Sequence, residues 1–412
     1  MTKHATRDDI LPVILGGDTG VYPIGREFHE AYGIKSVCVV PEPISMVKNS
    51  RIFDVERTEA LGKEDIVRAV TGLAERNPQK TLLLIANTDG MIKRISDVSS
   101  QLPSNVTCCV PPAGPMERVS NKVEFAKLCD EFGLLTPKTQ VVDLSIPGDV
   151  APSQIPFPLV AKPAVSAEYT SFIFKGCKKV YFVQSQEELD AVWSQMREVG
   201  FEGTFLVQEL IPGDDTYMGS ITLYVDSNGK TTMFGAAHVL LEDHSPSMLG
   251  NPVAMITHEV PELWRGTAAM LESIGWQGFA NFDVKTDPRD GRELLFEVNP
   301  RIGRNSYYNL AGGVNPMECL VDDLVDGKAI EPRVVDQEVL YTMVPVSLLR
   351  RYVRDEKLKA RLEQLIADGK VFDPQRYAED RSLRRTTIVT LTEINQVRKF
   401  NRYYPKPTDT SF

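Results

Sequence analysis

The sequence predicts an α/β protein in which a parallel-sheet domain comes before a larger domain built from hairpins. Short apolar runs alternate with helical patterns over residues 11–110, and this order is typical of βαβ units around a parallel sheet. Hairpin candidates follow at 221–239 and 278–301. The chain has 412 residues, and at about 100–200 residues per domain we expect two or three domains.

The first hundred residues contain three expected strands and two expected helices. The strands are LPVILGG (11–17), SVCVV (36–40) and TLLLIA (81–86), and the helices are 24–32 and 64–75. Ligands of parallel sheets bind beyond the carboxyl ends of the strands. Two turns, at 16–20 and 87–90, fall at such ends.

The middle of the chain changes character after a Pro- and Gly-rich stretch at 111–120, which we interpret as a linker. A helix is expected from Asn121 to Phe132, with Gly133 as its stop signal. The next expected strands are 157–164, 178–183 and 205–212. Residues 221–239 form a hairpin candidate with its turn at Ser227-Asn228-Gly229.

A helix near 261–274 leads into two strands, 278–285 and 293–301, joined by a polar turn. For the last eighty residues the pattern favours a helix at 346–367 and then a strand at 386–392.

Composition is that of an ordinary globular protein, with 42% apolar and 25% charged residues. The six cysteines show no CxxC spacing, which favours reduced thiols and a cytoplasmic protein. The first residues lack the pattern of a signal peptide. The longest apolar runs fall far short of the ~20 residues of a transmembrane helix.

The net charge of −10 argues against general nucleic-acid binding. From residue 343 onward, 15 Lys and Arg stand against 9 Asp and Glu. A solvated helical face is the commoner explanation of such an excess, and a patch that receives an acidic substrate is the alternative.

Three oxygen-bearing residues form the strongest candidate site. Glu297 and Asn299 share a strand face because side chains alternate with a period of two, and a turn near 287–290 brings Asp283 back to them. Magnesium prefers a few such hard oxygens. Arg301 lies on the same face, where its guanidinium can hold phosphate oxygens.

Two weaker signals point to a nucleotide. Lys162 ends a buried apolar strand, where a lysine needs an anion or a route to water. VQELIPGDD (207–215) is an extended strand ending in a turn, which can offer backbone groups to an adenine edge and a carboxylate to ribose. Each also fits an ordinary surface strand.

Together these motifs resemble the ATP-grasp superfamily of carboxylate–amine ligases. The resemblance implies a Rossmann-like pre-grasp domain at 1–112, an ATP-grasp domain at 113–330 and a C-terminal α+β extension at 331–412. It assigns ATP contacts to Lys122, Lys162, Gln208, Glu209, Leu210 and Asp215, and metal contacts to Asp283, Glu297 and Asn299. The resemblance makes Lys162 and Arg301 the catalytic residues, with Lys162 on the α-phosphate of ATP and Arg301 near the transferred phosphate. Mg²⁺, or Mn²⁺ in its place, would be the metal.

Within the superfamily, four stretches are similar to the peptidoglycan D-aspartate ligases: 14–36, 211–215, 278–285 and 296–304. These enzymes attach a β-activated D-amino acid to a muramyl-peptide precursor of the cell wall. The EVNPR motif (297–301) also occurs in carbamoyl-phosphate-synthase-like relatives, so another carboxylate–amine ligase acting on small metabolites stays open. The loop 164–177 lacks the Gly-rich sequence that many ATP-grasp enzymes place over the phosphates.

The resemblance implies that a substrate carboxylate attacks ATP to give an acyl phosphate, which an amine then converts to an amide. The expected partners are therefore ATP, a carboxylate-bearing amino acid and an amine acceptor; an oligomer is left open. Candidate contacts to the amino acid are Arg304, Ser306, Asp18 and Arg26. His238, Asp243, His244 and His258 can be drawn as a metal site, but no HxxH spacing supports it.

Two other classes of protein are alternatives to a ligase. A dinucleotide-dependent oxidoreductase is suggested by GGDTGVYPIG, but the GxGxxG spacing fails. The second alternative is a non-catalytic nucleotide-binding or scaffold protein that kept the fold and lost the chemistry. The presence of Asp283, Glu297 and Asn299 together argues against it, since only catalysis or MgATP binding needs all three.

Overall fold

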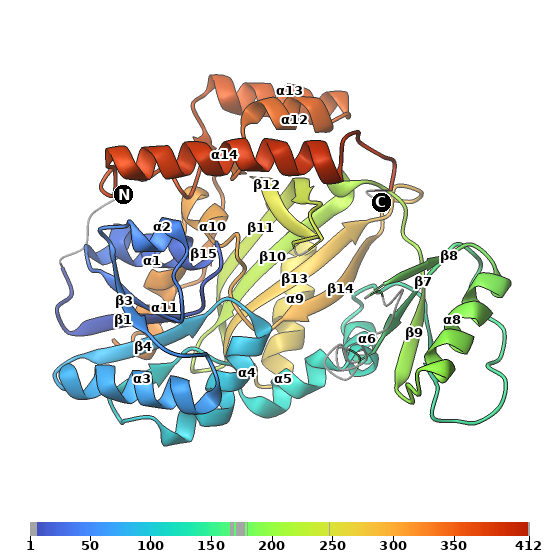
Figure 1. Ribbon diagram of the computed structural model, residues 1–412, viewed down its shortest axis with the longest axis horizontal. Coiled ribbons are helices and arrows are strands. Elements are labelled where there is room, and N and C mark those ends of the chain that lie inside the picture. The colour runs from blue at the N-terminus through green and yellow to red at the C-terminus, as the bar shows by residue number, and fades with distance from the viewer. Residues whose placement is uncertain (1–5, 165–168, 170–177, 179, 247, 411–412) are drawn as a thin grey trace.

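Three β-sheets make up the framework of the computed structural model, which describes residues 6–164, 169, 178, 180–246 and 248–410. A five-stranded sheet lies at the N-terminal side, an eight-stranded sheet at the centre, and a four-stranded sheet forms a separate lobe (Figure 1). The α/β class predicted from the sequence is confirmed.

The N-terminal sheet is parallel throughout, in the order β3-β2-β1-β4-β5. Its strands are β1 (Ile10–Leu15), β2 (Ser36–Val40), β3 (Phe53–Arg57), β4 (Thr81–Ala86) and β5 (Val106–Cys108). Its helices are α1 (Val21–Tyr32), α2 (Ser45–Lys48), α3 (Lys63–Arg76), α4 (Asp89–Val98) and the short η1 (Ser99–Gln101). The three expected strands and two expected helices are confirmed; β3, β5 and α4 were not foreseen.

The stretch 111–120 is not a linker. It forms helix α5 (Ala113–Ser120), which precedes α6 (Lys122–Glu131). Proline is tolerated near a helix start, because the first N–H groups have no partner inside the helix. Met116 and Val119 are buried, so core packing holds α5 in place, and the Asn121 side chain caps α6.

The four-stranded sheet is antiparallel, in the order β6-β9-β7-β8. Its strands are β6 (Thr139–Asp143), β7 (Leu159–Pro163), β8 (Tyr181–Val183) and β9 (Thr204–Glu209), and helix α8 (Gln186–Glu198) belongs to the same lobe. On β7, Leu159 and Ala161 are buried in the lobe's core, so Val160 and Lys162 face the other way. The loop 164–177, which lacks the Gly-rich sequence, lies outside the described residues except for Ala164 and Tyr169.

The eight-stranded sheet runs β14-β13-β10-β11-β12-β16-β17, and β15 pairs with β11. Its strands are β10 (Met218–Val225), β11 (Thr231–Asp243), β12 (Asn251–Thr257), β13 (Gly278–Thr286), β14 (Glu293–Asn299), β15 (Arg333–Val334), β16 (Leu340–Thr342) and β17 (Val371–Phe372). Helix α9 (Pro261–Ser273) packs on it, and η2 (Asp215–Tyr217) precedes β10. Both predicted hairpins are confirmed. Because residues beyond 330 add strands to this sheet, the domain boundaries stay predictions.

The remaining helices are α10 (Tyr307–Ala311), α11 (Pro316–Leu324), α12 (Val346–Tyr352), α13 (Glu356–Ala367) and α14 (Leu383–Tyr403). The strand expected at 386–392 is wrong, because these residues lie inside α14, which crosses the top of Figure 1. Its β-branched residues favour a strand locally. The Ser382 cap and an inner face of Arg385, Val389, Gln396 and Phe400 at helical spacing override that preference. The helix expected at 346–367 is divided into α12 and α13, with Asp355 capping the second.

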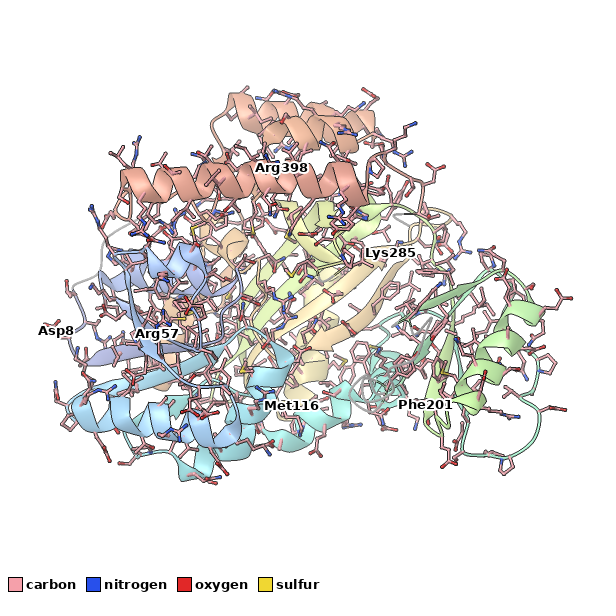
Figure 2. The ribbon with its side chains drawn as sticks, in the orientation of Figure 1. Asp8, Arg57, Met116, Phe201, Lys285 and Arg398 are labelled. Atoms are coloured by element: carbon pink, nitrogen blue, oxygen red, sulfur yellow. The ribbon has the colours of Figure 1, made fainter. Side chains whose placement is uncertain are left out.

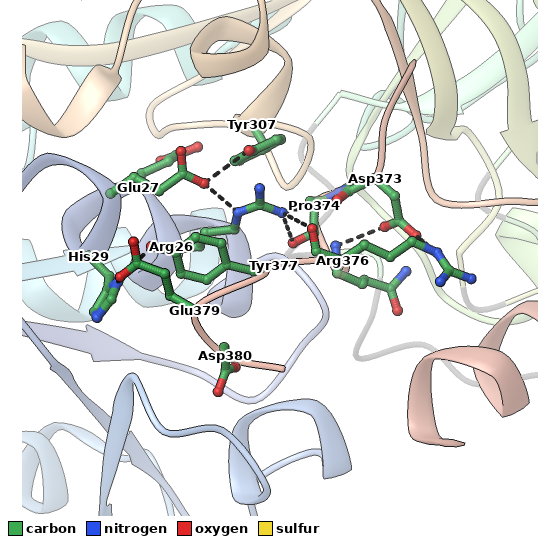
Figure 3. A network of polar contacts seen from close by, with 12 residues as sticks. Arg26, Glu27, His29, Tyr307, Asp373, Pro374, Arg376, Tyr377, Glu379 and Asp380 are labelled. Carbon is green, nitrogen blue, oxygen red and sulfur yellow. Dashed lines mark hydrogen bonds and ion pairs between the residues drawn. The ribbon is translucent and has the colours of Figure 1, made fainter. Parts of the chain in front are cut away.

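Arg26 on α1 connects the N-terminal domain to the C-terminal segment, residues 373–382 (Figure 3). Its guanidinium donates to the carbonyls of Asp373, Pro374 and Arg376 at 2.8–3.0 Å and pairs with Glu30. Arg26 is 8% exposed and already paired, so in this structure it holds two parts of the chain together. Its contact with a substrate stays a prediction.

The described cysteines are all free thiols, as expected. Over the described ranges, no helix combines the length and the apolar character that crossing a membrane requires.

Candidate active site

A cavity of about 360 Å³ lies between the four-stranded and the eight-stranded sheets. Its apolar wall includes Val160, Phe182, Ile211, Met218, Val239 and Phe296. Its polar lining includes Lys162, Gln208, Glu242, Asp283, Lys285 and Glu297. An apolar slot with a few convergent charges is the usual form of a small-molecule site.

The acids reach the cavity through the register of β13 and β14. Asp283 lies opposite Glu297, and Asn281 lies opposite Asn299. The pairing shifts by one residue after Asp283, which is a local bulge. The Asn299 side-chain amide donates to Asp283 at 3.3 Å. The structure therefore brings Asp283, Glu297 and Asn299 together, with both acids on the cavity wall.

The electrostatic surroundings of Asp283 and Glu297 favour binding of a cation between them. Burial, followed by the nearby Glu297 charge, raises the pKa of Asp283 to about 7. Arg301 and Asn299 oppose that rise. Two carboxylates facing each other in a buried site repel unless a proton or a metal lies between them. Within the described ranges no three His, Cys, Asp or Glu residues gather as a metal site, so the third ligand would be the Asn299 oxygen.

Lys162 enters the cavity from the opposite sheet. Its pKa is lowered to about 8, first by burial and then by the charge of Lys122, while Glu297 raises it. Its Nζ lies 5.8 Å from the centre of the Phe296 ring. The two predicted lysines thus lie near each other and near the acids. A buried lysine in this setting lacks a compensating anion.

The end of β9 and the two residues after it, 208–211, form one edge of the cavity. The Gln208 side chain donates to Thr139 at 2.8 Å, and the Glu209 carboxylate accepts from the Lys138 amide at 3.0 Å. The Leu210 amide donates to the Pro158 carbonyl at 3.3 Å. Gln208, Glu209 and Leu210 all line the cavity, as the adenine prediction requires.

Asp215 does not line the cavity. It is 3% exposed, accepts from the Glu242 amide at 2.9 Å and meets His244 Nε2 at 2.9 Å. His244 in turn stacks on Tyr404 with ring centres 3.6 Å apart. The ribose contact predicted for Asp215 is therefore not available from this position, and the side chain contacts His244 instead.

Two charged residues that were not predicted from the sequence, Glu242 and Lys285, line the cavity. Glu242 on β11 is half-buried in the lining, and burial, followed by the Asp215 charge, raises its pKa well above the usual range. Lys285, labelled in Figure 2, lies on β13 and donates to the Gly213 carbonyl at 2.9 Å. Burial lowers its pKa, whereas Glu242 raises it. The spacing of two between Asp283 and Lys285 on one strand was the available signal.

Arg301 follows β14 directly. Its Nε donates to Asp89 at 3.1 Å, and its Nη1 lies 3.4 Å from Asn281 Oδ1. Asp89 opens α4 after the turn 87–90, so Arg301 connects the acid pair to the carboxyl end of the parallel sheet.

Asp18 and Arg304 meet at the same edge. Asp18 accepts from Arg304 Nε at 2.6 Å and from Asn87 at 2.8 Å, and Arg304 also donates to Asn251 at 2.7 Å. Both side chains keep some exposure, 24% for Asp18 and 32% for Arg304. A Cβ on Gly20 would lie 2.1 Å from Asn87 Nδ2 and 2.9 Å from the Arg304 Cα, so only glycine allows this approach.

Ser306 is fully buried and donates to Glu27 at 2.7 Å. Its predicted contact with a substrate is therefore wrong, since the hydroxyl is used inside the protein. The four residues drawn as a metal site do not gather as one within the described ranges. His244 meets Asp215, Asp243 accepts from Ser245 and pairs with Lys399, and His238 faces His258 with ring centres 6.1 Å apart.

Solved structures with this fold define its class. N5-carboxyaminoimidazole ribonucleotide synthetase (purK) in complex with ADP aligns over 82% of each chain, with a TM-score of 0.54 and 13% identity. Biotin carboxylase from Campylobacter jejuni aligns over 77% of this chain and 71% of its own, with a TM-score of 0.55 and 14% identity. The fold is that of the ATP-grasp enzymes.

Sequence similarity narrows the class. The chain is 32% identical to D-aspartate ligase of Enterococcus faecium, over 98% of this chain and 99% of that one. It is 26% identical to D-alanine–D-alanine ligase of Ectopseudomonas mendocina over 45% of this chain and 57% of that one. No family model matches. The chain belongs to the D-aspartate ligase family and is an ATP-dependent ligase, as its sequence predicted.

Proposed function

We propose that this protein joins a D-aspartate-like amino acid to an amine of a peptidoglycan precursor, with ATP converted to ADP and phosphate. The observation that carries the proposal is the convergence of Lys162, Asp283 and Glu297 on one cavity, with Arg301 beside Asp283. Similarity to D-aspartate ligase over nearly the whole chain supports the choice of substrate. Since the reaction uses ATP, the cytoplasm is the proposed compartment.

ATP lies in the cavity with its adenine between the apolar walls and against the strand 208–210. Glu242, rather than Asp215, is the carboxylate proposed for the ribose, because it is the one on the lining. Lys162 and Lys122 hold the phosphates: phosphate oxygens supply the anion that buried Lys162 lacks, and their binding raises its pKa again.

Asp283, Glu297 and Asn299 would hold Mg²⁺, with Mn²⁺ as the alternative. The donors fit, since they are hard oxygens and the acid pair is short of positive charge. The metal would neutralise charge on the transferred phosphate. Arg301, which pairs with Asp89, would also neutralise charge on the transferred phosphate.

The reaction has two steps. An oxygen of the substrate carboxylate bonds to the γ-phosphorus while the bond between that phosphorus and the β–γ bridging oxygen breaks, which gives an acyl phosphate and ADP. The acceptor nitrogen then bonds to the acyl carbon, phosphate leaves with the former carboxylate oxygen, and the nitrogen loses a proton to solvent. No side-chain nucleophile is needed, so catalysis comes from positioning and electrostatics.

Asp18 and Arg304 are the proposed contacts for the rest of the amino acid. Arg304 can hold a second carboxylate in a forked contact, and Asp18 can accept from an ammonium group. They bond to each other at 2.6 Å without substrate, so a zwitterion would replace one ion pair by two.

The test measures phosphate released from ATP with D- and L-aspartate and with D- and L-alanine, each with and without a muramyl-pentapeptide acceptor. The proposal predicts release that depends on D-aspartate and on the acceptor, with a product heavier by one aspartyl residue. Release with another acid would reassign the substrate. No release with any pair would leave a protein that binds MgATP without catalysis.

A further inference from the structure

A second cavity, of about 310 Å³, lies where the segment 373–382 meets the first turn of α14. Figure 3 shows Arg376, Tyr377 and Asp380 of this segment. Three arginines line the cavity, namely Arg376, Arg381 and Arg385, against one carboxylate. None of its lining residues belongs to the ATP cavity.

The three arginines differ in how far they are already paired. Arg376 is neutralised by Glu393 at 2.6 Å. Arg385 is 3% exposed, donates to the carbonyls of Met46 and Gln375, and forms an ion pair with Asp380 through Nε at 3.3 Å. These contacts use three of the five N–H donors of a guanidinium. Arg381 is exposed, and its guanidinium makes no hydrogen bond or ion pair with any residue in the described ranges.

The carboxylate in the lining does not cancel that charge. Asp380 is 1% exposed and accepts from the Tyr22 hydroxyl at 2.9 Å, the Ser50 hydroxyl at 2.7 Å and the Arg51 amide at 2.7 Å. Because these donors and Arg385 occupy Asp380, that carboxylate does not neutralise Arg381, for which no ion pair is found within the described ranges.

A buried polar group in the lining also lacks a partner. Gln375 is 5% exposed, and its side-chain nitrogen has no hydrogen-bond acceptor among the described residues. A buried amide without a partner is destabilising, so an acceptor atom of a ligand at this position would be favoured. Gln375 also lines a smaller neighbouring cavity of about 140 Å³ that reaches Thr19, next to Asp18.

We propose that this second cavity binds a phosphate or diphosphate group. Arg381 and the free donors of Arg385 supply the forked N–H contacts that phosphate oxygens prefer, and the Gln375 amide supplies another. The cavity adjoins the N-terminal end of α14, whose dipole favours negative charge. The group belongs either to a phosphate-bearing acceptor or to a free ion.

The test is calorimetric titration of the full chain with inorganic pyrophosphate, after the ATP cavity has been filled with Mg²⁺ and a non-hydrolysable ATP analogue. One binding event is expected, weakened about tenfold or more by Arg381→Glu. Gln375→Leu should weaken it by a smaller factor. Arg384→Glu is the matched control, because Arg384 is an exposed neighbour on α14 outside the lining, and it should leave binding unchanged.

The proposal is overturned if the wild-type protein binds no pyrophosphate under these conditions, or if Arg381→Glu and Arg384→Glu weaken binding equally. Steady-state kinetics of the Arg381→Glu variant distinguish the two sources of the phosphate group. A raised KM for the acceptor in Arg381→Glu assigns the group to the acceptor. An unchanged KM, with pyrophosphate binding still lost, assigns it to a free ion. Neither result depends on which amino acid the enzyme uses.

Discussion

Two groups of buried charges in this protein are treated in opposite ways. At the junction between α1 and the C-terminal segment, Arg26 and Asp380 have their donors and acceptors matched by carbonyls, hydroxyls and opposite charges. In the ATP cavity, Lys162 makes no hydrogen bond or ion pair with any residue in the described ranges, and Asp283 faces another acid.

The difference teaches which charges serve folding and which await a ligand. A matched buried charge stabilises the arrangement around it, and loss of one partner is strongly destabilising. An unmatched one costs stability and shifts its pKa, which is typical of functional sites. The pKa of Lys162 is lowered to about 8 and that of Asp283 is raised to about 7, both first by burial. Substitutions in the two groups should therefore separate activity from stability.

The largest effect is expected for Glu297→Gln. The change keeps the shape of the side chain and removes a charge from the proposed metal site, so phosphate release should fall by about 100-fold or more. The melting temperature should stay within about 2 °C of wild type. Glu293→Gln, on the same strand but outside the ATP cavity, is the matched control and should keep its activity. Wild-type turnover in Glu297→Gln would end the metal assignment.

Lys162→Met is expected to lower kcat/KM for ATP by about 100-fold. Its free energy of unfolding should equal or exceed that of wild type, because the variant removes a buried charge that has no counterion. Steady-state kinetics and urea unfolding check the two halves. Lys127→Met, at an exposed helix position, is the control. A strongly destabilised Lys162→Met protein would mean that the lysine serves folding.

Arg26→Met should show the reverse pattern. It removes the Arg26 donors from three backbone carbonyls and leaves Glu30 with Tyr307 as its donor, so the free energy of unfolding should fall by about 3 kcal/mol. Activity per folded molecule, measured below the unfolding transition, should change less than about threefold. If activity falls as far as in Lys162→Met while stability is kept, Arg26 contacts a substrate after all.

The smallest effect, on the pH dependence of stability, is expected for Glu27. One carboxylate oxygen of this buried acid near the junction has no hydrogen-bond partner among the described residues. Burial raises its pKa to about 8 from an ordinary 4.5. Between these values the folded protein holds a proton that the unfolded chain has released, so stability falls as pH rises through that window. Glu27→Gln should remove this part of the slope, at most about 1.4 kcal/mol per pH unit. Urea unfolding at pH 5, 6, 7 and 8 measures it, with exposed Glu64→Gln as control. Equal slopes for all three proteins would contradict the assignment.

Much of the cavity could be predicted because its residues lie in regular strands. The period of two and the turn at 287–290 were enough to bring Asp283 and Glu297 together. The bulge after Asp283 could not be foreseen, and it lets neighbours Phe296 and Glu297 both line the cavity. Lys162 and the strand at 208–210 were found through their resemblance to a family rather than from their pattern alone.

The misses share a physical cause, which is contact between segments far apart in the sequence. Arg26 is matched by carbonyls about 350 residues away, and Asp215 contacts His244 and the Glu242 amide, 29 and 27 residues away. Local propensity made 386–392 a strand, whereas packing against the rest of the protein made it part of α14. The sequence carries no short-range signal for such contacts.

Transfer of oxygen from the substrate to phosphate tests the central claim most directly. D-aspartate labelled with ¹⁸O in both carboxyl groups is incubated with the enzyme, ATP and the acceptor, and the released phosphate is analysed by mass spectrometry. An acyl phosphate formed in this cavity predicts one ¹⁸O atom in each phosphate released with product. Phosphate without ¹⁸O, alongside labelled product, would contradict the mechanism.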